Sequence, residues 1–235
     1  LTDAELAKDG YVFVFQDARG TGKSEGRFIM NGALHDPKAD PNGTDEATDT
    51  YDTIDWLVKN IPANNGRVGV MGVSYPGWLA GIAALSGHPA LKAVSPQAPM
   101  TDTWMGDAFF HQGAFRLSYG FEYATDMELS NDGSIPVPID RYDAYDWYLQ
   151  LGSLANVSRG VLKGKSVPTW RNFTAHPPYD AFWKARALPT YLTSLTGPTM
   201  TVGGWWDQED FYGPLKTYHG ALKRRGVIGF AIAFG

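Results

Sequence analysis

The order of the elements in the sequence predicts an α/β fold with a mostly parallel sheet. Short apolar segments typical of strands, at residues 11–16, 67–73 and 91–96, alternate with helix-compatible segments at residues 44–60 and 78–86. Strands that alternate with helices pack as a parallel sheet with crossover helices on its faces. The chain has 235 residues, 43% of them hydrophobic, so it can bury a sizeable core.

The first strand and the first helix are predicted from their residue types. Residues 11–16 (YVFVFQ) are β-branched and aromatic, which is typical of a buried strand. Residues 44–60 place apolar side chains on an approximate helical period. Asp45 and Glu46 stand in the first turn of this helix, where the helix dipole favours anions. The NNG sequence at residues 64–66 then predicts a turn.

The next three elements follow the same pattern. Residues 67–73 (RVGVMGV) form a short apolar run that predicts a strand. Residues 78–86 (WLAGIAALS) predict a buried helix that ends near Gly87, and residues 91–96 (LKAVSP) predict another strand.

A change of pattern marks the middle of the chain. Between about residues 101 and 196, short aromatic segments with Pro and Gly replace the regular alternation. We interpret this region as a mostly helical cap, inserted into an α/β core made of residues 1–100 and 197–235. The elements expected after the cap are a strand, a helix and a last strand, at residues 198–203, 210–225 and 226–234.

Composition excludes several classes of partner and cofactor. The net charge is −5 with no basic run, so nucleic acid is not an expected partner. The absence of Cys excludes a disulfide framework and a thiolate nucleophile. There is no Cys pair or His-x-x-x-His spacing, so we expect no metal and no cofactor. No apolar run reaches the roughly 18 residues that a membrane span needs, so no membrane partner is expected.

The segment RGTGKS, at residues 19–24, resembles a phosphate-binding loop but lacks two of its requirements. Asp17 stands where the Walker A motif needs Gly, and no clean helix follows Ser24. We therefore expect Arg19 to support loop packing instead. Residues 1–10 lack the features of a signal peptide and begin without Met, so we expect a mature or trimmed chain.

A serine nucleophile is predicted in the segment GVSYPG, residues 72–77, which we interpret as a turn of the G-x-S-x-G type between a strand and a helix. Such a turn lifts the hydroxyl of Ser74 out of the sheet. Gly72 and Gly77 lack the Cβ atoms that would crowd it, and the amide of Tyr75 points to where an oxyanion would form. The alternative is a tight strand-to-helix turn with an incidental Ser.

A catalytic acid is predicted at Asp207. On this kind of sheet the acid follows a later strand than the nucleophile does, and Asp207 lies in the loop after the strand predicted at residues 198–203. Its task would be to orient a His and stabilise its charged form. The alternative is an N-cap for the helix that follows.

Several stretches together resemble one family, the α-amino acid ester hydrolases with their cocaine-esterase and X-prolyl dipeptidyl peptidase relatives (the CocE/NonD type). The stretches are QDARG (16–20), SEG (24–26), DTIDWL (52–57), GVSY (72–75), HPALK (88–92), WMGD (104–107), GAFR (113–116) and WDQED (206–210). They span most of residues 16–213. The last three are specific to the amino-ester branch or close to it, and the others are shared more widely.

The resemblance implies an α/β-hydrolase fold with a helical cap and a C-terminal jelly-roll domain. It implies Ser74 as nucleophile, Asp207 as triad acid and the amide of Tyr75 as an oxyanion-hole donor. A second donor, a Tyr hydroxyl, would lie N-terminal of this chain. The resemblance also suggests a homo-oligomer and a periplasmic or secreted location.

A carboxylate cluster that holds the α-ammonium group of the substrate is a further implication of the resemblance. Glu209 and Asp210 match two of its members, and grouped carboxylates favour a cation beside the scissile carbonyl. The third member would fall on Ala108, where the family has an acid, with Asp107 as a partial substitute. The alternative is that Glu209 and Asp210 are a solvated first turn of the next helix.

The chain departs from the family at its end. The catalytic His of the family follows the strand after Asp207, in a segment similar to G-P-W-x-H, but this chain has IGF at residues 228–230 and no His beyond His219. The jelly-roll domain is also missing. We therefore expect a truncated chain or an altered tail, nearly inactive alone, because a Ser needs a base. His111 is expected to line the cap or pocket, and His219 to be a surface or packing residue.

Three functions follow from these residues. The first is a serine hydrolase that cleaves α-amino acid esters or β-lactam-type amides, or transfers their acyl groups, through an acyl-enzyme on Ser74. The second is a broader carboxylesterase or X-prolyl dipeptidyl peptidase without selectivity for the α-ammonium group. The third is a non-catalytic hydrolase-like binding protein. Glu209 and Asp210 favour the first, Ala108 the second, and the missing His the third.

Overall fold

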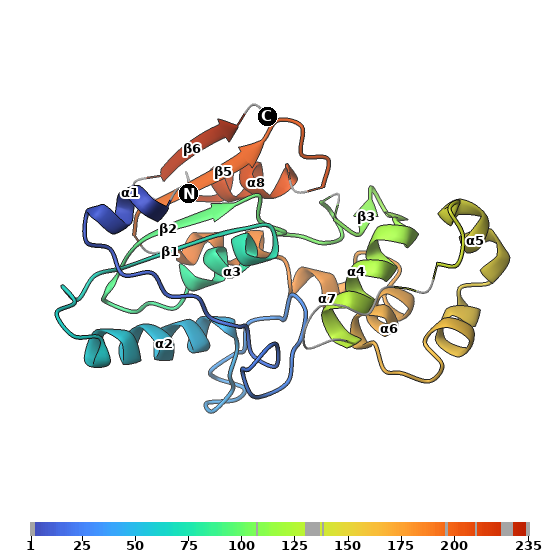
Figure 1. Cartoon of the computed structure of the whole chain (residues 1–235), viewed down its shortest axis with the longest axis horizontal. Coiled ribbons are helices and arrows are strands. Elements are labelled where there is room, and N and C mark those ends of the chain that lie inside the picture. The colour runs from blue at the N-terminus through green and yellow to red at the C-terminus, as the bar shows by residue number, and fades with distance from the viewer. Residues whose placement is uncertain are drawn as a thin grey trace.

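A four-stranded parallel sheet in the order β1-β2-β5-β6 organises the structure (Figure 1). The structure is a computed structural model and describes residues 3–106, 108–129, 137, 139–195, 197–209, 211–221 and 228–233. A small antiparallel pair, β3-β4, lies outside this sheet. The parallel sheet with its helices confirms the predicted α/β fold.

The elements in chain order are α1 (Asp3–Lys8), α2 (Glu46–Asn60), β1 (Val68–Val73), α3 (Tyr75–Ala83), β2 (Leu91–Gln97), β3 (Phe110–His111), β4 (Ala114–Phe115), α4 (Leu117–Leu129), α5 (Ala144–Leu151), the π-helical turn η1 (Val157–Val161), α6 (Pro168–Ala175), α7 (Ala181–Lys184), the 3₁₀ segment η2 (Leu188–Ser194), β5 (Thr199–Gly204), α8 (Tyr212–Ala221) and β6 (Ile228–Ala233).

The register of the sheet brings the ends of three strands into line. Val73 at the end of β1 pairs with Gln97 of β2, and Gln97 pairs with Val202 of β5. Because all the strands run in the same direction, the residues that follow each of them meet at one edge of the sheet. In Figure 1 the strands point toward the side where α4, α6 and α7 gather.

The helical region and the sheet share one hydrophobic core. The buried cluster joins Trp78 of α3 and Val94 of β2 to Phe109 and to Trp170 of α6. Phe173 packs against Phe115 and Trp183, with ring centroids 5.2 and 5.9 Å apart. Many of the aromatic side chains noted in the sequence are therefore packed against each other beside the sheet. The division into a core and a cap at residues 101 and 196 stays a prediction.

The strand predicted at residues 11–16 is wrong. The segment has no strand structure, and Tyr11, Val12 and Phe15 are 63, 65 and 86% exposed. A strand needs a neighbour to accept and donate its ladder hydrogen bonds, whereas the amide of Tyr11 donates to the carbonyl oxygen of Leu6 beside α1. Apolar composition does not by itself supply such a partner.

The start of α2 is fixed by a capping box. Asp45 is the N-cap residue rather than a first-turn residue: its Oδ1 accepts from the Thr48 amide at 2.8 Å, and the Thr48 hydroxyl accepts from the Asp45 amide at 2.9 Å. Oδ2 of Asp45 contacts Nδ1 of His35 at 2.9 Å. Burial alone would raise the pKa of Asp45, but the hydrogen bonds from Thr48 and His35 outweigh burial and lower it.

Asp45→Ala is expected to lower the free energy of unfolding by about 1–2 kcal/mol at pH 7. Because the folded pKa lies below the unfolded value of about 3.9, the charged carboxylate stabilises the fold above that pH. This contribution is lost as the pH falls through the folded pKa. Urea unfolding at pH 7 and near pH 3 checks this. Asp140→Ala removes a carboxylate of an exposed ion pair and serves as control; a difference that persists unchanged at low pH contradicts the cap assignment.

Among the described residues, no helix is both long and apolar enough to cross a bilayer.

Candidate active site

Ser74 occupies a strained turn between β1 and α3. Its backbone angles are φ 62° and ψ −122°, a conformation that L-residues rarely adopt. The Ser74 amide donates to the carbonyl oxygen of Gln97 at 3.0 Å, and the Ser74 carbonyl oxygen accepts from the amide of Trp78 at 3.0 Å. Helix α3 begins at Tyr75, three residues earlier than predicted, because the turn consists of Ser74 alone.

Two glycines make this turn sterically feasible. A Cβ on Gly72 would lie 2.3 Å from the carbonyl oxygen of Pro76, and one on Gly77 would lie 2.1 Å from that of Gln97. The second glycine stands three residues after Ser74, so the segment departs from the strict G-x-S-x-G spacing by one residue. Its position is explained by the packing: Gly77 is where α3 touches the backbone of β2.

Tyr75 is the first residue of α3, so its backbone amide lies at the N-terminus of the helix beside Ser74. Its side chain points into the core, where the ring packs against Trp78 with centroids 5.4 Å apart. The amide of Asn31 donates to the Tyr75 hydroxyl oxygen at 3.3 Å. Burial raises the pKa of Tyr75, so the phenol is neutral and serves packing.

Asp207 lies in the loop after β5, as predicted. It is half-buried, its amide donates to the Gly204 carbonyl oxygen at 3.2 Å, and its Oδ1 accepts from the Glu209 amide at 3.0 Å. Both Ser74 and Asp207 therefore follow strands that end at the same edge of the sheet, with β2 between them. Two strand spacings, about 10 Å, separate the strand ends, a span that an interposed imidazole and the two side chains could bridge.

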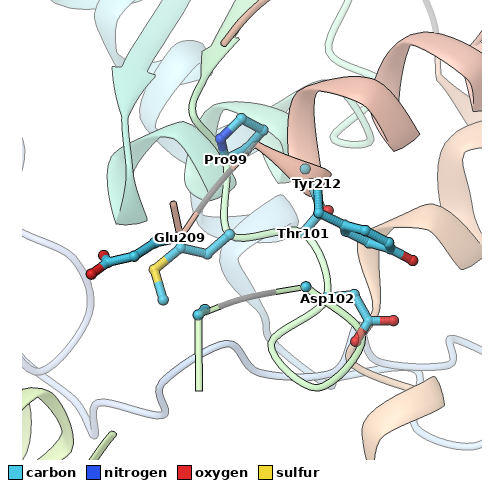
Figure 2. Close-up of a pocket in the computed structure, with 9 residues that line it drawn as sticks. Pro99, Thr101, Asp102, Glu209 and Tyr212 are labelled. Atoms are coloured by element: carbon cyan, nitrogen blue, oxygen red, sulfur yellow. The ribbon is translucent and has the colours of Figure 1, made fainter. Parts of the chain in front are cut away.

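A crevice too narrow to hold a water molecule lies next to this edge. Its lining comes from the segment after β2, from Glu209 and from the start of α8; the residues are Pro99, Met100, Thr101, Asp102, Gly106, Ala108, Glu209, Tyr212 and Gly213. Figure 2 shows the carboxylates of Glu209 and Asp102 turned to opposite sides, with the Tyr212 ring on the side of Asp102. Ala108 and Glu209, two positions matched to the expected ammonium cluster, both line this crevice.

Arg116 was not assigned a role from the sequence, although it belongs to the matched GAFR stretch. Its Nη2 lies 3.6 Å from Oε1 of Glu209, and its Nη1 donates to the carbonyl oxygen of Ala108 at 3.4 Å. Both side chains of the ion pair are 25% exposed. Two positions matched to the expected ammonium cluster, 108 and 209, therefore contact one guanidinium group.

Asp102 is a second residue that sequence reasoning missed. It is buried, its Oδ1 accepts from the amides of Trp104 and Met105 at 3.1 and 2.9 Å, and its Oδ2 accepts from the hydroxyl of Tyr179 at 2.6 Å. Burial, reinforced by the hydrogen bond to Asp102, raises the pKa of Tyr179, so the phenol remains a donor. This contact ties the helical region to the wall of the crevice.

Two predicted substrate-binding residues, Asp107 and Asp210, lie outside the described residues. The five histidines take different positions. His35 and His176 contact Asp45 and Asp180 at 2.9 and 2.7 Å, each at the start of a helix. His88 is buried, while His111 is exposed on β3. His219 is exposed on α8, in agreement with its predicted surface role.

The loop that resembles a phosphate-binding loop is organised by its own acid. Oδ2 of Asp17 accepts from the Lys23 amide at 3.0 Å, so this loop amide already has a carboxylate partner. Arg19 forms a bidentate ion pair with Asp49 of α2 and donates to the Thr44 hydroxyl at 2.8 Å, which confirms its packing role. Across the part of the chain that the structure describes, no group of three or more His, Asp or Glu side chains is arranged to hold a metal ion.

The strand-turn-helix geometry at Ser74, on this parallel sheet, defines a protein of the α/β-hydrolase class. The family model of the X-Pro dipeptidyl-peptidases (S15 family) matches residues 1–233, and the chain belongs to this family, whose members are serine-type hydrolases. This assignment agrees with the resemblance seen in the sequence.

Three relatives illustrate the likeness. A crystal structure of an aminopeptidase from the marine sediment archaeon Thaumarchaeota archaeon is 42% identical, with a TM-score of 0.87 over 97% of this chain and 38% of that one. An α-amino acid ester hydrolase structure is 39% identical, with a TM-score of 0.86 over 94% and 36%. Cocaine esterase of Rhodococcus sp. (strain MB1 Bresler) is 30% identical over 86% of this chain and 35% of its own length. The chain thus spans little more than a third of each.

Proposed function

We propose that the intact protein hydrolyses α-amino acid esters, or related amides including β-lactam-type amides, through an acyl-enzyme on Ser74. The observation that carries this proposal is the strained conformation of Ser74 at the strand end, with Asp207 following a strand at the same sheet edge. Two of the similar structures, an aminopeptidase and an α-amino acid ester hydrolase, have names that specify substrates with an amino group.

The chemistry assigned to these residues follows from their positions. The Ser74 hydroxyl attacks the carbonyl carbon of the ester, and its proton passes to a histidine base that Asp207 orients. The Tyr75 amide, at the N-terminus of α3, donates to the oxyanion of the tetrahedral intermediate. The leaving alcohol takes the proton from the base, and water then releases the acid from Ser74. Glu209 attracts the α-ammonium group of the substrate.

A second candidate is an esterase or dipeptidyl peptidase without selectivity for the ammonium group. Ala108 favours it, because this residue is 2% exposed in the crevice and offers a methyl group where an acid is expected. The ion pair between Arg116 and Glu209 also favours it, because a carboxylate that already has a cation attracts a second one less. A non-catalytic binding protein would have no need to retain the strain at Ser74.

A covalent serine probe tests the acyl-enzyme. A fluorophosphonate is expected to label the intact protein at Ser74, to leave Ser74→Ala unlabelled, and to label Asp207→Asn far more slowly because the base loses its orientation. Equal labelling of Ser74→Ala and the wild type contradicts the proposal. A glycine ester and its N-acetyl analogue then separate the two candidates: a higher kcat/KM for the glycine ester supports the ammonium subsite, and equal rates exclude it.

A further inference from the structure

We propose that Arg116 determines specificity: it acts as a built-in counter-ion of Glu209 and limits how strongly the enzyme prefers a cationic acyl group over a neutral one. This inference rests on the proposed function and deepens it, because it names the charge class of the acyl group that the enzyme prefers. The juxtaposition that carries it is the contact of one guanidinium group with Ala108 and Glu209.

The position of Arg116 is set by its surroundings. It lies between β4 and α4, its amide donates to the carbonyl oxygen of Phe109 at 2.8 Å, and its guanidinium lies 5.0 Å from the ring centroid of Tyr119. Backbone and side chain are therefore both held. The guanidinium group reaches the crevice lining as part of the fold rather than as a freely moving surface arginine.

Arg116 offsets part of the negative charge that the described residues place around the crevice. Asp102 accepts hydrogen bonds from two backbone amides and from the Tyr179 hydroxyl, so its negative charge is stabilised within the fold. Glu209 also lines the crevice, and its carboxylate forms an ion pair with the guanidinium group of Arg116. A substrate ammonium must share the Glu209 carboxylate with a guanidinium that is already there.

The ion pair between Arg116 and Glu209 is partly exposed, so a substrate ammonium group can compete with Arg116 for the Glu209 carboxylate. Arg116 and Glu209 are each 25% exposed and separated by 3.6 Å, which is an ion pair open to water rather than a sealed one. Partly exposed pairs of this kind contribute little, because water and salt screen them. A substrate ammonium can therefore reach Glu209, but it gains less from doing so than it would beside an unpaired carboxylate. Ala108 adds no attraction for the ammonium group, because its side chain has no charge.

Two substitutions in the intact protein test this inference. Arg116→Met removes the charge and keeps a long apolar stem, and Ala108→Asp adds the missing carboxylate. Each is expected to raise the ratio of kcat/KM for a glycine p-nitrophenyl ester over that for its N-acetyl analogue by about tenfold. Arg116→Lys, which keeps the charge, and Ala108→Asn, which adds the volume without charge, are the matched controls and should change the ratio by less than about twofold.

A purely structural role for Arg116 predicts a different result. In that case Arg116→Met lowers kcat/KM for both esters by the same factor, the ratio stays constant, and the inference is overturned. The same is true if Arg116→Lys behaves like Arg116→Met, because the charge would then be irrelevant.

A binding measurement separates this inference from the proposed function. Calorimetric titration of glycinamide and N-acetylglycinamide into Ser74→Ala, with and without Arg116→Met, reports the subsite without turnover. If the serine probe fails to label Ser74, the acyl-enzyme is excluded, but a tenfold gain in affinity for glycinamide alone would still support the counter-ion. If labelling succeeds and the affinity ratio does not move, the acyl-enzyme stands and the role of Arg116 falls.

Discussion

Ser74→Ala is expected to lower kcat/KM of the intact protein for an ester substrate by at least about a thousandfold, with the fold retained. Removal of the hydroxyl takes away the atom that forms the acyl-enzyme, and the remaining oxyanion donor and binding contacts provide only residual catalysis. Steady-state kinetics with a p-nitrophenyl ester measure the loss. Circular dichroism and thermal unfolding confirm that the variant is folded.

The stability of variants at position 74 gives a second readout. Because Ser74 has a φ of 62°, the fold carries backbone strain there, and Ser74→Gly is expected to stabilise the protein by about 1 kcal/mol while abolishing activity. Ser158→Ala, at an exposed serine of η1, is the control and should leave both activity and stability unchanged. Full activity in Ser74→Ala, or loss of stability in Ser74→Gly, would show that the turn has a different purpose.

Gly77→Ala is expected to lower the free energy of unfolding by about 2–4 kcal/mol. The new Cβ would lie 2.1 Å from the carbonyl oxygen of Gln97, so α3 must move away from β2. The same carbonyl oxygen accepts from the Ser74 amide at 3.0 Å, so the movement also disturbs the turn at Ser74. Chemical denaturation measures the stability change, and the serine probe measures the loss of reactivity.

The control for Gly77→Ala is a substitution at a glycine with open space where a Cβ would stand. Gly160 in η1 has nothing within 4 Å of the position where a Cβ would stand, so Gly160→Ala should change stability by less than about 0.5 kcal/mol. Similar effects of the two substitutions would mean that the close approach between α3 and β2 relaxes easily. A large effect on stability with normal probe labelling would separate the packing role of Gly77 from the geometry of Ser74.

The sheet could be predicted from the sequence where local pattern and pairing agree. The apolar runs that became β1, β2 and β5 each lie between recognisable helices or turns, and the structure pairs them in parallel. Residues 11–16 are also apolar but are mostly exposed and have no ladder. Propensity describes how well a segment fits a sheet surface, whereas a strand also requires partners, which the composition of one segment does not reveal.

Part of the candidate site could likewise be predicted from the sequence, and part could not. The positions of Ser74 and Asp207 after their strands follow from local patterns in the sequence. The contacts of Arg116 with Glu209, and of Tyr179 with Asp102, join residues 93 and 77 positions apart in the sequence. No periodicity links such positions. The GAFR stretch was a signal that pointed to Arg116, and only the fold shows which acid it meets.

The lining of the crevice belongs to different elements from the strained turn, and this separation bears on how such an enzyme can evolve. Ala108, Arg116 and Glu209 lie on loops after β2, β4 and β5, whereas Ser74 depends on β1 and α3. Mutations at these lining positions can therefore accumulate without touching the glycines that shape the turn at Ser74. A directed library confined to positions 108, 116 and 209 should retain a high fraction of folded, probe-reactive clones and still diverge in substrate range.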